Sequence, residues 1–165
     1  MYKGLIVRIN DFMRKIHLIV IHCSATRADK ELTAFDLDTM HRRRGFNGTG
    51  YHYYIRKDGT THLTRPVERI GAHAKGFNAE SIGICYEGGL DCRGRPADTR
   101  TPEQRAALRL LVHQLQERFP GCRVCGHRDL SPDRNGNGEI VDGKGLCGVG
   151  LGLGTHRHPV AGHKA

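Results

Sequence analysis

Short apolar runs alternate with polar and glycine-containing segments along the 165-residue chain. Runs rich in β-branched residues predict strands, and apolar residues spaced three and four apart predict helices that pack one face on a core. On this basis we expect strands at 15–22, 51–57, 60–65, 81–86 and 123–126, and helices at 33–44 and 101–119. Because strands and helices are interspersed without internal repeats, the order predicts a single α/β domain with a mixed central β-sheet flanked by helices.

Turn and cap residues sharpen two of these boundaries. Asp58-Gly59 separates two strand-like runs and predicts a tight hairpin. Thr101 followed by Pro102, with Gln104 three residues after the threonine, is typical of a helix start. The sequence thus predicts an antiparallel pair near the middle of the chain and a long helix beginning at 101–102.

The first predicted helix has a weaker apolar stripe. Thr33 is suited to cap it, and Phe35, Leu37 and Met40 supply its apolar positions.

Composition and charge indicate which classes of binding partner to expect. The formal net charge is +9 with a pI near 9.6, which favours polyanions such as an acidic cell wall, although general solubility is an equal explanation. The densest basic run, 41–44, carries no nucleic-acid reader motif, so we expect no nucleic-acid partner. The mean hydropathy is −0.51 and no apolar run approaches the ~20 residues of a membrane span. We expect a monomer without a membrane span.

The N-terminus and the six cysteines bear on the compartment. Residues 1–22 lack the layout of a secretory signal, so the protein is expected to be made in the cytoplasm and to reach any cell-wall substrate after release. Free thiols are then the expected state of the cysteines. Cys122 and Cys125 have metal or redox spacing, but no second pair exists, so we interpret them as core and surface residues.

Two of the eleven histidines stand at the carboxyl ends of predicted strands. His22 ends the first strand and His127 follows the last one. Rigid strands fix the direction of an imidazole, and zinc hydrolases commonly use three protein ligands and leave a fourth position for water. Taken alone, each histidine is more often a core or surface residue than a metal ligand, whereas two at the carboxyl ends of strands suit a metal site.

Six segments in order resemble the type-2 N-acetylmuramoyl-L-alanine amidases, a family that includes phage amidase-type lysozymes and catalytic peptidoglycan recognition proteins. They are VIHCSAT at 20–26, GYHY at 50–53, IRKDGT at 55–60, GAHAKGFN at 71–78, SIGI at 81–84 and GHRDLSPD at 126–133. The resemblance covers about residues 13–140. It implies an amidase domain at 13–147, with an N-terminal extension at 1–12 and an atypical, poorly ordered glycine- and histidine-containing tail at 148–165.

The resemblance also implies a zinc-bearing cleft at the strand ends and a peptidoglycan substrate. Its metal ligands would be His22, His127 and Cys147, and its catalytic residues would be Tyr51 and Lys144. The zinc ion would activate a water molecule for hydrolysis of the bond between N-acetylmuramic acid and L-alanine. The residues alone favour a different interpretation of Tyr51, as a half-buried strand aromatic.

Two further histidines lie within the matching segments. His73 would resemble a substrate contact, and a structural hydrogen-bonding role is an equal alternative. His52 alternates with Tyr51 along the strand, so it should face the other way and be structural.

The match departs from the family at its end. Relatives have a lysine, one residue and then Cys-Pro, whereas this chain reads Lys144-Gly145-Leu146-Cys147-Gly148. Asp142, His156 and His158 are alternative third ligands. The departure leaves open a non-catalytic peptidoglycan-binding protein with an incomplete zinc site. The loop 133–138 matches the start of an EF-hand, but Lys144 occupies its twelfth position, so we interpret it as an Asx-rich turn.

Overall fold

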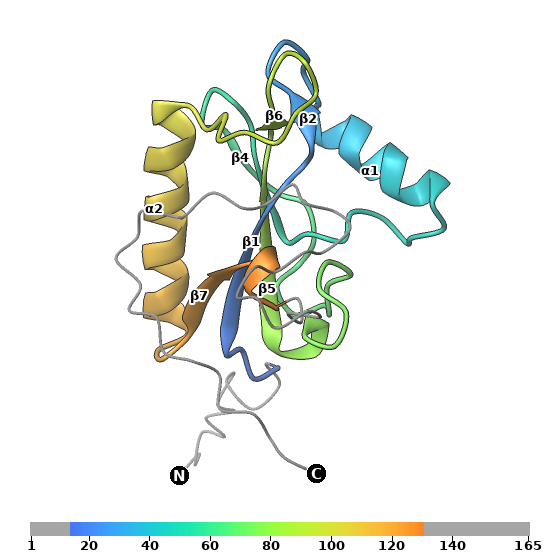
Figure 1. The fold of residues 1–165 in the computed structure, drawn as a ribbon. Coiled ribbons are helices and arrows are strands. Elements are labelled where there is room, and N and C mark those ends of the chain that lie inside the picture. The colour runs from blue at the N-terminus through green and yellow to red at the C-terminus, as the bar shows by residue number, and fades with distance from the viewer. Residues whose placement is uncertain (1–13, 131–165) are drawn as a thin grey trace, which may run out of the picture.

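The computed structural model describes residues 14–130 (Figure 1). Seven strands and two α-helices occur in this part of the chain, together with two short 3-10 turns. In chain order they are β1 (Leu18–Cys23), β2 (Thr26–Arg27), α1 (Ala34–Arg43), β3 (Tyr53–Ile55), β4 (Thr61–Leu63), η2 (Asn78–Glu80), β5 (Ser81–Tyr86), β6 (Gly89–Leu90), α2 (Pro102–Arg118), β7 (Arg123–Gly126) and η3 (His127–Leu130).

The central sheet has the order β4-β3-β5-β1-β7. Strands β3, β5, β1 and β7 are parallel, and β4 is antiparallel to β3. The predicted mixed sheet is therefore confirmed, as is the hairpin around Asp58-Gly59. A second sheet pairs β2 with β6, and each of these strands has only two residues. We did not predict them, because two residues carry no readable periodicity.

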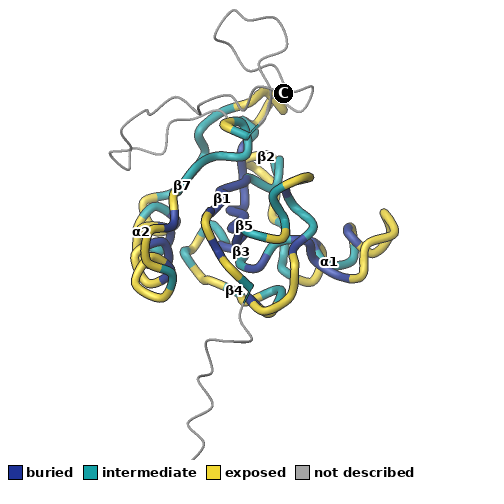
Figure 2. The backbone as a smooth tube through the Cα atoms, turned by 90° about the horizontal axis from the view of Figure 1, so that it is seen from below, coloured by how far each residue is buried: buried dark blue, intermediate teal, exposed yellow. Residues whose placement is uncertain are grey.

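Helix α2 covers one face of the sheet and forms the larger core (Figures 1 and 2). Its N-cap is the predicted one: the Thr101 hydroxyl accepts from Gln104 N, and the Gln104 side chain accepts from Thr101 N. Side chains from α2 and from the alternating positions of the parallel strands make up this core. They include Ile19, Ile21, Ile82, Ile84, Leu108, Leu111, Val112 and Leu115.

Helix α1 lies on the opposite face over a smaller cluster of Leu37, Tyr54 and Cys85 (Figure 2). Phe35 and Met40, two of the three apolar positions expected in this helix, are 79% and 45% exposed. A helix turns about 100° per residue, so Phe35 is rotated about 200° from Leu37 and cannot share its contact face.

The described cysteines, which exclude Cys147, are all free thiols. Cys122 is buried and donates to the carbonyl of Ile16 at 3.1 Å, while Cys125 is half-buried. This agrees with a structural interpretation of the pair. Among residues 14–130, no helix combines the length and apolar character needed to cross a lipid bilayer.

Candidate functional site

The parallel register of β1 and β7 brings His22 and His127 together. Ile21 is paired with Gly126, so the residue that follows each lies at the same level of the sheet. The two imidazole centroids are 4.7 Å apart. The turn after β7 is held by Asp129, whose carboxylate accepts from Gly126 N at 2.8 Å. Two rings separated by more than 100 residues in sequence thus meet at one point.

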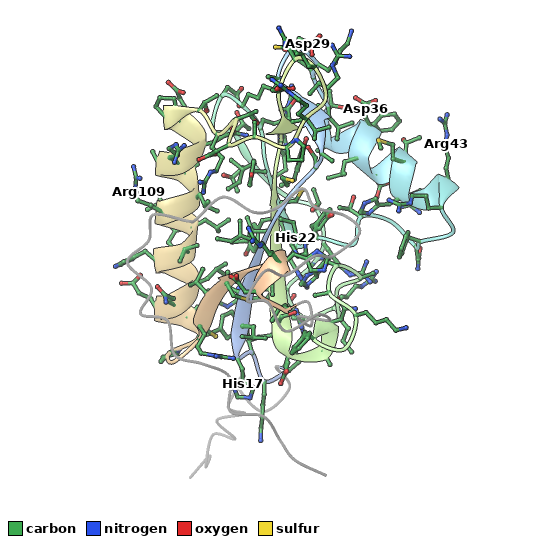
Figure 3. All side chains as sticks on the ribbon, viewed as in Figure 1. His17, His22, Asp29, Asp36, Arg43 and Arg109 are labelled. Atoms are coloured by element: carbon green, nitrogen blue, oxygen red, sulfur yellow. The ribbon has the colours of Figure 1, made fainter. Side chains whose placement is uncertain are left out.

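His22 is almost fully enclosed, with 3% of its surface exposed. Figure 3 shows it near the middle of the molecule, between the two helices. Burial lowers the pKa of His22 well below its ordinary value, and the neighbouring His73 and His127 lower it further. His22 is therefore neutral at pH 7, which is the form that can bind a metal.

Tyr51 lies beside this pair, with its ring centroid 5.0 Å from that of His22. The backbone just before it is tied on both sides: Gly50 N donates to His41 Nδ1 at 2.9 Å, and Gly50 O accepts from Ala72 N at 2.9 Å. A Cβ at Gly50 would collide with the Ala72 carbonyl, so only glycine fits there. These contacts fix the position of Tyr51 relative to the histidines.

His73 approaches His22 from the other side. Its Nδ1 is 3.0 Å from His22 Nε2, and its Nε2 is 3.3 Å from the hydroxyl of Ser81. The side-chain carbonyl of Asn78 accepts from the backbone N–H groups of His73 and Ala74, both at 2.8 Å, and so holds the loop. Burial lowers the pKa of His73 to about 3. His73 therefore contacts a predicted metal ligand directly, as the structural hydrogen-bonding alternative requires, and its contact with substrate stays a prediction.

Two glycines make room for the His73 ring. A Cβ at Gly83 would lie 2.6–2.8 Å from three ring atoms of His73, and a Cβ at Gly71 would lie 2.5 Å from His73 Cδ2. The ring thus rests directly on backbone, where no other residue type would leave space. The sequence did not predict this close packing of Gly71 and Gly83 against His73, because nothing in the pattern linked these glycines to a histidine.

His52 is completely buried and structural, as expected. Its Nδ1 accepts from Gly83 N at 3.0 Å, and its Nε2 is 2.9 Å from the carbonyl of Arg69. Burial lowers the pKa of His52 to about 4.

His41 is the residue that the sequence interpretation missed, because it was grouped with the basic run 41–44. It is buried, and its ring centroid is 5.4 Å from that of Tyr51. Helical spacing is the signal that could have identified it, since His41 follows the buried Leu37 by four residues on one face of α1.

The donors present fit a zinc ion in part. His22 and His127 place two imidazoles at one point, and imidazole nitrogens are common zinc ligands. Within residues 14–130 no three His, Cys, Asp or Glu side chains form a complete metal site. Cys147 and Lys144 lie outside the described residues, as do Asp142, His156 and His158. The third ligand and the lysine therefore remain predictions.

Comparison with known proteins agrees with the sequence resemblance. A family model described as N-acetylmuramoyl-L-alanine amidase matches residues 12–139. The endolysin of Klebsiella phage KP32 is 38% identical over 114 residues, which is 69% of this chain and 76% of that protein.

Solved structures show the same similarity. The endolysin N-acetylmuramoyl-L-alanine amidase LysCS from Clostridium intestinale is 34% identical, with a TM-score of 0.62 over 72% of each chain. Drosophila PGRP-LB is 26% identical, with a TM-score of 0.62 over 72% of this chain and 73% of that one.

Proposed function

This chain belongs to the N-acetylmuramoyl-L-alanine amidase family, and from that premise we propose that it uses one zinc ion to hydrolyse the bond between N-acetylmuramic acid and L-alanine in peptidoglycan. The similarity to phage endolysins and to solved amidases supports peptidoglycan amidase activity. The observation that carries the zinc assignment is the meeting of His22 and His127, 4.7 Å apart, with Tyr51 beside them.

His22 and His127 would hold the metal, with Cys147 as the third ligand. Zinc, when bound, would polarise the scissile carbonyl and lower the pKa of a coordinated water molecule. Enclosure keeps His22 neutral, so no proton has to leave it before it can bind.

Tyr51 would act on the substrate. Attack of water on the lactyl carbonyl places negative charge on the carbonyl oxygen, and a phenol donor held beside that oxygen stabilises the charge. The tie between Gly50 and His41 keeps the phenol from moving away from the histidines. The carbon–nitrogen bond then breaks, releasing a lactyl carboxylate and the free amino group of L-alanine. The net charge of +9 would favour approach to an acidic cell wall.

The test is digestion of purified sacculi, with new alanine amino termini measured by mass spectrometry. The wild type should release them, and His22→Ala and Cys147→Ser should not. His113→Ala is the matched control, since this histidine on α2 has a side chain that is 72% exposed, and it should behave as wild type.

Two outcomes would revise the proposal. Binding to sacculi without any new amino termini would contradict hydrolysis and identify a peptidoglycan-binding protein. Full zinc-dependent activity in Cys147→Ser would refute the third ligand while leaving the reaction intact.

A further inference from the structure

A chain of hydrogen bonds leads from the backbone through two buried side chains to His22. The Ser81 hydroxyl is 2.7 Å from the carbonyl oxygen of Phe77 and 3.3 Å from His73 Nε2. His73 Nδ1 in turn is 3.0 Å from His22 Nε2. Ser81 has none of its surface exposed, so water does not compete for its hydroxyl.

The direction of each hydrogen bond follows from the Phe77 carbonyl, which stands at one end of the series. A carbonyl oxygen can only accept, so the Ser81 hydroxyl donates its single proton to Phe77 O. The opposite arrangement, with Ser81 donating to His73, would use the 3.3 Å contact in place of the 2.7 Å one. The serine oxygen therefore accepts, and the proton between Ser81 and His73 belongs to His73 Nε2.

The tautomer of His22 then follows. A neutral imidazole has one N–H and one lone pair, so His73 Nδ1 is the acceptor when its Nε2 carries the proton. His22 must therefore donate from Nε2, which leaves the lone pair on His22 Nδ1. We infer that Ser81 and His73 are positioning residues that fix His22 in the Nε2–H tautomer and present its Nδ1 to the metal.

Gly71 and Gly83 hold the His73 ring in place, and this makes the hydrogen-bonded series from Ser81 through His73 to His22 (the relay) rigid. Gly71 and Gly83 leave no space for a Cβ between the ring and the backbone, so the ring keeps its position only while these residues are glycine. Hydrogen bonding to the second nitrogen of a ligating histidine generally fixes the ring and raises its basicity. Ser81 and His73 thus set the orientation and the tautomer of His22 before a metal ion binds.

The direct test is the two-bond 15N–1H correlation spectrum of the histidine rings in the full chain at pH 7, after removal of metal by chelation. His22→Gln provides the assignment. We expect the His22 proton on Nε2 and an unprotonated Nδ1. A proton on His22 Nδ1 would overturn the inference, and the spectrum that decides this is recorded on the wild-type chain.

Variants supply a second readout, zinc affinity measured by competition with a chelator. His73→Ala should weaken zinc binding about 10- to 100-fold, the usual effect of losing the partner of a metal ligand. Ser81→Ala should weaken it about fivefold, as expected for one hydrogen bond. Ser24→Ala is the control, because its hydroxyl bonds Thr26 and Gly88 instead, and zinc affinity should not change.

Unchanged affinity in both His73→Ala and Ser81→Ala would refute the relay. The inference rests on the proposed zinc site, but the two fail separately. A chain that binds no zinc yet holds His22 as the Nε2–H tautomer contradicts the proposed function and leaves the relay standing.

Discussion

Substitution of Gly83 by alanine tests the packing around His73. The added Cβ would lie 2.6 Å from two ring carbons, whereas ordinary contact begins at 3.4 Å. The ring must therefore retreat by about 0.8 Å (3.4 − 2.6), and the His73–His22 bond starts at 3.0 Å. Overpacking of this kind costs about 1–3 kcal/mol of unfolding free energy. A loss of 1 kcal/mol corresponds to roughly 2–4 °C in Tm for a domain of this size.

A double-mutant cycle isolates the clash. The three atoms nearest the added Cβ all belong to His73, so removing that ring should remove the penalty. Urea unfolding of the wild type, Gly83→Ala, His73→Ala and the double variant should show a coupling of at least ~1 kcal/mol. If Gly83→Ala lowers the unfolding free energy equally in the presence and absence of the His73 ring, a Cβ at position 83 does not clash with that ring.

Three further predictions concern the site. Tyr51→Phe should slow digestion of sacculi about 10²- to 10³-fold, as for loss of one oxyanion donor, with zinc content unchanged; a rate within threefold of wild type would contradict its role. His41→Ala should lower both the digestion rate and the unfolding free energy, because the buried Gly50 N–H loses its acceptor. The unfolding free energy should fall by about 1–3 kcal/mol, and unchanged stability in urea would refute a stabilising role for the Gly50–His41 hydrogen bond. The unfolding free energy should fall as pH drops below 6.5, because His52 and His73 have folded pKa values of about 4 and 3 and the unfolded chain binds more protons in that interval. Below both folded pKa values the loss should approach roughly 3 kcal/mol for His52 and roughly 5 kcal/mol for His73. A rise in stability between pH 6.5 and 5 in urea titrations would show that the buried rings are not held neutral.

Much of the architecture was predictable because it rests on local signals. The strand at 81–86 and the strand at 123–126 were predicted with the observed bounds, since continuous apolar runs end at turn residues. The capping box at Thr101 fixed the start of α2 in the same way. The meeting of His22 and His127 was also anticipated, because both stand at the carboxyl ends of strands that share one edge of a parallel sheet.

What could not be predicted depends on contacts between distant segments. The bond between His73 and His22 spans 51 residues and has no periodic signature. The need for glycine at Gly83 arises only once the His73 ring lies over it. The exposure of Phe35 follows from which face of α1 meets the sheet, a choice that apolar content alone does not specify.

The zinc content of the purified chain is the most direct test of the central claim, that His22 and His127 jointly hold one catalytic metal ion. Inductively coupled plasma mass spectrometry after dialysis should find close to one equivalent of zinc in the wild type. His22→Ala and His127→Ala should each lose most of it and cease to digest sacculi. A wild-type chain that digests sacculi without zinc, or variants that both retain a full equivalent, would contradict the account.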